Sequence, residues 1–329
     1  MNSHTRGIQL SLLCLLILVV LPIFATVRTN DGSAITFSFW LSFWQLVFAT
    51  PVYLFQRKQA QLSDAPERKL RRFSKIQTWA LVLLTGILFS AATFAYVLGV
   101  DQTGPVTFAV AIQAYPFFAL LWEALFLKRR KSIWELTFIL VIATSMVYLG
   151  TQGTWRLSTV THGFWIALIV PLLWSVAHVI IKEMMNASAI TPSEVIVTRV
   201  LVATLLLGIA CLFNQGFGGF LTDGMTLKFQ LVALLMGIAY YLELLSWFSA
   251  VKYIDVSIGA SITAPAPAVT VLVAVVLLGQ ELHSYQAVAL LSVLGSVIGL
   301  IRYGKRYGSA AILSVGEHQA LGNHVHRPP

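Results

Sequence analysis

The feature that most constrains this chain is a series of apolar stretches, each about as long as a membrane-crossing helix, separated by short blocks of charge. A helix needs about 20 apolar residues to cross the hydrocarbon core of a bilayer. Of the 329 residues, 57% are hydrophobic and 11% are charged, whereas about 25% of the residues in soluble domains are charged. A soluble fold could not bury so much apolar surface. We therefore expect an all-α integral membrane protein whose solvent is the lipid bilayer.

Hydropathy predicts ten transmembrane helices, five before and five after a polar connector near residues 150–163. No catalytic or phosphate-binding motif interrupts them: the sequence has no Walker A, GxSxG or HExxH pattern, so ATP-driven pumping by this chain alone is excluded. Cys14 and Cys211 lie within apolar stretches and are interpreted as packing residues. We expect no cofactor, no metal site and no enzymatic activity. The predicted spans are residues 8–27, 34–55, 76–98, 105–127, 133–149, 164–181, 195–213, 229–251, 257–278 and 285–303.

Basic residues indicate how the chain is oriented, because loops rich in Lys and Arg remain in the cytoplasm. Many of the 22 Lys and Arg residues fall in two loops, residues 56–75 and 128–131. A cytoplasmic N-terminus places both loops, and most other basic residues, on the cytoplasmic side. We therefore predict a multi-pass protein of the inner (plasma) membrane with both termini in the cytoplasm. Orientation accounts for the net charge of +9, and no nucleic-acid partner is expected.

The two halves of the chain resemble each other. A shift of 151 residues aligns LLTGI at 83–87 with LLMGI at 234–238, and Pro116 with Pro267. Each predicted half has five spans, and an odd number requires the halves to lie inverted in the membrane. The expected organisation is a first repeat at 8–150, a second repeat at 163–303 and a short cytoplasmic tail at 304–329.

Three segments of the second half carry a family resemblance: ALIVPLLWSVAHVIIKEM at 167–184, TPSEVIVTRVLVATLLL at 191–207, and the stretch from TAPAPAV to SVIGL at 263–300. They resemble the ten-helix, EamA-type members of the drug/metabolite transporter superfamily. The resemblance covers roughly residues 8–303 and implies two five-helix repeats and a transport function. In the first half, Trp40 stands where Arg199 would align. Members of the superfamily move amino acids, nucleosides, vitamins, polyamines and drugs, so the resemblance does not identify the cargo.

Ionisable side chains within the predicted spans are candidates for the solute site, because each is costly in hydrocarbon unless it faces a cavity or a partner. Glu123, His178, Arg199 and Glu243 are such residues. At a rise of about 1.5 Å per residue, Glu243 lies about 10 Å, and Arg199 and His178 about 8 Å, from the cytoplasmic ends of their spans. Arg199 and Glu243 either pair or jointly bind a zwitterion. Glu243 is interpreted as the partner of a substrate amine or as the carrier of a coupling proton.

Aromatic and amide side chains complete the set of candidates. Tyr240 and Trp247 share a helical face with Glu243, and Trp174 shares one with His178, so each set forms a stripe. These stripes either line a cavity or are ordinary packing contacts. Gln45 and Gln113 lie near mid-membrane, where an amide needs a partner, and interhelical hydrogen bonding is the alternative role. Pro116, Pro265 and Pro267 predict kinks in two repeat-related spans.

Together these features predict a secondary transporter of small metabolites such as amino acids or related compounds, working by alternating access. Export is the favoured direction of transport. The alternative is a membrane-embedded enzyme acting on a lipid-linked substrate, and a scaffold or sensor is a third reading. The expected partners are a small-molecule solute and the lipid bilayer. Proton coupling and the choice between monomer and homodimer are left open.

Overall fold

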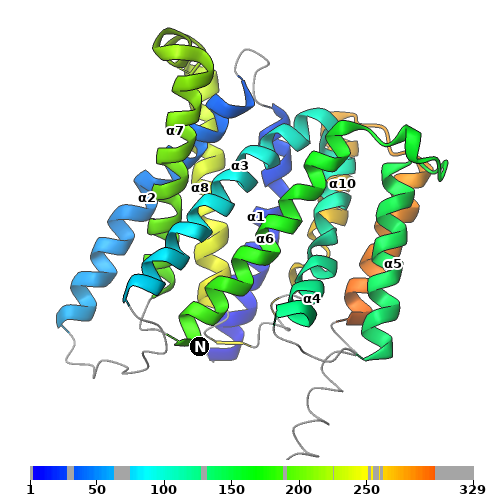
Figure 1. Cartoon of the computed structure of the whole chain (residues 1–329), viewed down its shortest axis with the longest axis horizontal. Coiled ribbons are helices and arrows are strands. Elements are labelled where there is room, and N and C mark those ends of the chain that lie inside the picture. Colours follow the sequence, from blue (N-terminus) through cyan, green and yellow to red (C-terminus); the bar gives the residue numbers. More distant parts are fainter. Residues whose placement is uncertain are drawn as a thin grey trace, which may run out of the picture.

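The computed structural model describes residues 3–27, 33–62, 75–126, 132–187, 191–224, 226–250, 253–254, 259 and 262–300. Every regular element in these residues is helical (Figure 1). The elements are α1 (Ser3–Val27), α2 (Ala34–Leu62), α3 (Lys75–Ala111), η1 (Ile112–Ala114), α4 (Tyr115–Phe126), α5 (Ile133–Gly150), η2 (Leu157–Thr159), α6 (His162–Ala187), α7 (Pro192–Gly224), α8 (Leu227–Ala250), α10 (Ala266–Leu278) and a last helix, Ser284–Leu300.

Among the described residues, seven helical stretches are long and apolar enough to cross a membrane, and two shorter apolar helices, Ala266–Leu278 and Ser284–Leu300, follow them. Many leucines on these helices are exposed, as expected for side chains that face lipid. The predicted class, an all-α membrane protein, is confirmed. The count of ten crossings stays a prediction. Residues 255–258, 301–303 and the whole tail at 304–329 lie outside the described residues.

One stretch, Ile76–Trp122, is 47 residues long, which as a straight helix would measure roughly 70 Å, more than twice the hydrocarbon thickness of a bilayer. Gly104 interrupts it with φ 72° and ψ 162°. Glycine adopts a positive φ without steric cost, and Pro105 is well suited to begin the next helical segment. The chain turns there and runs back toward α4 (Figure 1). The predicted spans 76–98 and 105–127 therefore lie on separate helical segments.

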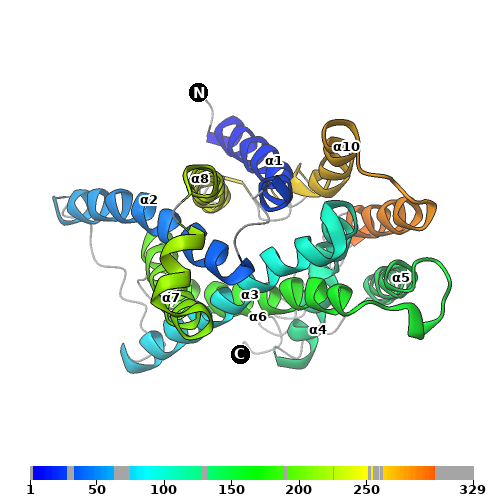
Figure 2. The same cartoon turned by 90° about the horizontal axis from the view of Figure 1, so that it is seen from above.

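The helices pack mainly in pairs drawn from the two halves. α1 packs against α8, α2 against α7, and α3 against α6. Seen from above, α3 and α6 run through the middle of the molecule, with α2 and α7 toward one end and α5 toward the other (Figure 2). The largest buried apolar cluster follows α3 and draws on α1, α6 and α10. Side chains on α3 and α6 are therefore the ones that meet in the interior.

Two glycines that align between the halves allow close helix contacts. A Cβ at Gly86 in α3 would lie 2.6 Å from Cβ of Val202 in α7. A Cβ at Gly237 in α8 would lie 2.8 Å from Cβ of Trp44 and 3.1 Å from the carbonyl oxygen of Leu41, both in α2. Small residues at such crossings are typical of membrane helices, because they let backbones approach closely.

Polar side chains link α2 and α7 near both ends of the pair. At one end, Thr36 donates a hydrogen bond to Oε1 of Gln215 (2.6 Å), and the amide nitrogen of Gln215 donates to the hydroxyl of Ser33 (2.7 Å). At the other end, the hydroxyl of Ser193 donates to the side-chain oxygen of Gln56. These two helices therefore form a seam, α2–α7, that is hydrogen-bonded at both ends.

Candidate functional site

Among the described residues, a cation and a carboxylate lie buried on neighbouring helices. Arg199 in α7 is 3% exposed and Glu243 in α8 is 9% exposed. A charged side chain at this depth is costly in a membrane protein unless other groups compensate for the lost water. The surroundings of these two residues therefore define the candidate site.

Arg199 lies against an aromatic ring. Its guanidinium carbon is 3.9 Å from the ring centroid of Phe89 in α3, a cation–π contact. Its Nε and Nη1 atoms have no hydrogen-bond partner among the residues that the structure describes. No acidic side chain of the described residues lies within 4.0 Å of the guanidinium. Arg199 therefore keeps donors available for a planar, anionic partner such as a carboxylate.

Glu243 faces the same region from α8. The thiol of Cys14 in α1 donates a hydrogen bond to its Oε1 at 3.7 Å. Arg199 and Tyr240 both lie near enough to interact electrostatically with the carboxylate. Among the described residues, Glu243 and Arg199 therefore lie near each other without forming a direct ion pair, and their joint binding of a zwitterion stays a prediction.

Aromatic rings from α3, α4 and α6 surround these charges. His178 lies between two rings, with centroids 5.5 Å from Phe89 and 5.7 Å from Tyr115. Trp174, one turn before His178, packs against Tyr96 at 5.9 Å. The hydroxyl of Tyr240 faces the indole of Trp174 without a well-formed hydrogen bond. We call the resulting group the central cluster: Cys14, Phe89, Tyr96, Tyr115, Trp174, His178, Arg199, Tyr240 and Glu243.

Three predicted site residues lie elsewhere. The side-chain amide of Gln113 in η1 donates to the backbone oxygen of Ala264 at 3.3 Å, so it links η1 to the segment just before α10. Gln45 is 3% exposed, and its amide nitrogen has no partner among the described residues. Trp247 packs on a separate apolar cluster of α2, α7 and α8. The side chain of Glu123 lies outside the described part of the structure.

Sequence reasoning missed four members of the central cluster. Cys14 was interpreted as a packing residue, and its contact with Glu243 joins positions 229 residues apart in sequence. Phe89 and Tyr96 lie seven residues apart on α3, a spacing that places both on one helical face. That spacing was a usable signal, but on its own it does not distinguish a site from a packing face. Tyr115 begins α4, and no pattern in the sequence pointed to it.

A pocket of the described structure lies away from the central cluster. It has a volume of about 390 Å³ and is lined by residues near the ends of α3, α5, α6 and α10. None of the predicted site residues lines it in the described structure. The pocket therefore belongs to a second region, which is considered below.

The chain belongs to the EamA-like transporter family, whose sequence model matches residues 5–151 and 161–302. The two matches confirm the resemblance to the drug/metabolite transporter superfamily and identify the molecule as a membrane transporter built from two EamA repeats. A solved structure described only as "Crystal structure of protein" is similar to 92% of this chain over 99% of its own length, with a TM-score of 0.61 and 15% identity. That similarity supports the fold alone. Among curated proteins, no match is found.

Proposed function

We propose that this protein is a secondary transporter, preferentially an exporter, of small zwitterionic metabolites such as amino acids. The observation that carries the proposal is the buried Arg199 and Glu243, which lie near each other among aromatic rings without an ion pair between them in the described structure. A guanidinium binds carboxylates with charge-assisted hydrogen bonds, and Glu243 offers the complementary partner for an ammonium group. The rings of Trp174, Tyr96 and Phe89 would contact the apolar part of the solute.

We further propose that the two repeats lie inverted, and the pattern of helix contacts supports this arrangement. Suppose that α1, α2, α3 and α4 of the first half correspond to α6, α7, α8 and α10 of the second half. Replacing each helix by its counterpart then converts the α1–α8 contact into the α6–α3 contact. It likewise converts α1–α10 into α6–α4 and α2–α8 into α7–α3, while α2–α7 maps onto itself. All of these pairs pack in the described structure. Inverted repeats around a central site are the usual basis of alternating access.

The α2–α7 seam is the element about which we expect the halves to rock. Each half contributes one helix to it, and hydrogen bonds hold it near both ends. The central cluster, in contrast, draws on α1, α3, α4, α6, α7 and α8, and its described residues make few hydrogen bonds between helices. Relative motion of the halves would therefore change the central cluster more than the seam.

Topology gives a test that does not depend on the solute. With ten crossings and both termini in the cytoplasm, a reporter fused after Arg156 should lie outside, and a reporter fused within the tail at 304–329 should lie inside. Alkaline phosphatase and green fluorescent protein fusions report these two sides. If both positions report the same side, inverted repeats with cytoplasmic termini are wrong.

Transport itself should be measurable with purified protein in liposomes. We expect exchange of a labelled amino acid without any nucleotide, driven by its own gradient, and a pH gradient added to the same vesicles tests proton coupling. A panel of amino acids, nucleosides and polyamines would separate the solute classes. If no member of the panel moves, transport of small metabolites is contradicted, and the alternative of an enzyme acting on a lipid-linked substrate gains support.

A further inference from the structure

The pocket at the helix ends lies at the opposite end of α3 and α6 from the central cluster. On α3, Gln102 lines the pocket and Phe89 belongs to the central cluster. Thr161, which also lines the pocket, directly precedes α6, and His178 lies on α6. These separations of 13 and 17 residues amount to roughly 20 Å and 25 Å along the helices. One pair of helices therefore connects the two regions.

A closed apolar layer separates them. Phe108 is fully buried, and its ring centroid lies 4.7 Å from that of Tyr96. A Cβ at Gly99 would lie 2.8 Å from the ring of Phe108 and 3.3 Å from Cα of Ala167 in α6, so there is no space between α3 and α6 at this level. The pocket is therefore a compartment of its own and not the open mouth of the central cluster.

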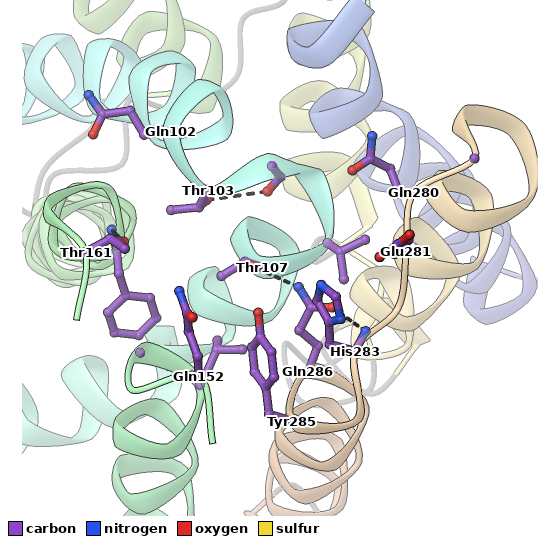
Figure 3. Close-up of a pocket in the computed structure, with 16 residues that line it drawn as sticks. Gln102, Thr103, Thr107, Gln152, Thr161, Gln280, Glu281, His283, Tyr285 and Gln286 are labelled. Carbon is purple, nitrogen blue, oxygen red and sulfur yellow. Dashed lines mark hydrogen bonds between the residues drawn. The ribbon is translucent and has the colours of Figure 1, made fainter. Parts of the chain in front are cut away.

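The wall of the pocket is held in place by hydrogen bonds. Gln286 is 5% exposed. Its amide nitrogen donates to the hydroxyl of Thr107 at 2.8 Å, and its side-chain oxygen accepts from the backbone nitrogen of His283 at 2.9 Å. The ring of His283 stacks on Tyr285 with centroids 5.5 Å apart. Figure 3 shows these side chains facing α3 across the pocket. Both repeats thus contribute to one ordered, polar wall.

The lining of the pocket carries negative charge and no Lys or Arg among the described residues. Glu281 is the carboxylate in it. Gln102, Gln152 and Gln280 also line the pocket (Figure 3). Among the described residues, none of these four side chains has a hydrogen-bond partner, so their donors and acceptors remain available. Such a lining favours an ammonium group with further polar atoms and disfavours an anion.

We propose that this pocket is a second solute-binding site for small molecules that carry a protonated amine. The ammonium group would bind Glu281, and the glutamine amides would hydrogen-bond the remaining polar groups of the solute. The proposal rests on the proposed function in one respect: the site would hold the solute between the membrane surface and the central cluster. Binding itself requires neither transport nor opening of the Phe108 layer.

Ligand-observed NMR titration of the purified full-length protein in detergent tests the proposal with three probes of similar size. They are n-butylamine, 4-aminobutanoate and butanoate, which are a cation, a zwitterion and an anion at pH 7. We expect saturable binding of the two amines and none of butanoate. Equal binding of all three, or binding of none, would overturn the proposal.

Two variants locate the bound amine. Glu281→Gln should weaken binding of n-butylamine about tenfold, because a charge-assisted hydrogen bond becomes a neutral one. Asp101→Asn removes a charge at the same end of α3, from a residue outside the pocket lining, and should leave the affinity unchanged. If Glu281→Gln has no effect, or if only Glu243→Gln weakens binding, the pocket is not the site. If the unmodified protein binds the amines but moves no solute in liposomes, the proposed function is contradicted and the pocket proposal stands.

Discussion

Replacement of Glu243 by glutamine should lower solute transport at least tenfold while leaving the protein folded. Glutamine has nearly the same shape, and it can still accept the hydrogen bond from Cys14. It removes the negative charge that would hold a substrate ammonium or carry a coupling proton. A hydrogen bond to a charged group is worth about 1.5–3 kcal/mol, which corresponds to a factor of about ten or more in rate or affinity. Initial rates of labelled amino acid exchange in liposomes measure this effect.

A matched control and a second variant separate function from folding. Glu135→Gln makes the same change in the capping box of α5, where glutamine can replace glutamate, and should leave transport normal. If Glu243 only neutralises Arg199, Glu243→Gln should instead reduce thermal stability, and the double variant with Arg199→Gln should restore much of it. Normal transport by a well-folded Glu243→Gln protein would show that the carboxylate has no role in the solute site.

The sequence located the charged part of the central cluster because an ionisable residue within an apolar span is conspicuous whatever the fold. Arg199, Glu243 and His178 stood out for this reason, and the aromatic stripes added Tyr240 and Trp174. Cys14 and Phe89 could not be recognised in the same way, because a thiol and a phenyl ring are ordinary in lipid. Their role depends on which helix faces which, and hydropathy within one helix does not encode that.

The polar pocket shows a second reason why a site can escape prediction from the sequence. Its residues come from the ends of helices and from the segment 279–286, where polar side chains are expected in any membrane protein. Nothing in the composition of these loops distinguishes a pocket wall from a solvated turn. The helices were more predictable: each predicted span overlaps a described helix, and Gly104 followed by Pro105 marks the turn that divides the longest apolar stretch.

The aligned glycines lead to the second large effect: Gly237→Ala should destabilise the protein by about 1–3 kcal/mol, the usual cost of overpacking. The added Cβ would lie 2.8 Å from Cβ of Trp44 and 3.1 Å from a backbone oxygen of α2. Backbone cannot move aside as a flexible side chain can, so α8 must shift away from α2. Gly237→Leu should abolish the folded protein, as measured by size-exclusion chromatography in detergent.

Gly295 provides the matched control, because it also lies within a helix and a Cβ there would meet no atom within 4 Å. Alanine is the better helix former by about 1 kcal/mol, so Gly295→Ala should leave the thermal midpoint unchanged or raise it. Gly237→Ala gains the same helix propensity but must displace α8, so its midpoint should fall. Equal midpoints for the two variants would mean that α2 and α8 do not pack closely at Gly237. Glu243 lies on the same helix, six residues beyond Gly237, so a shifted α8 should also impair transport in whatever protein still folds.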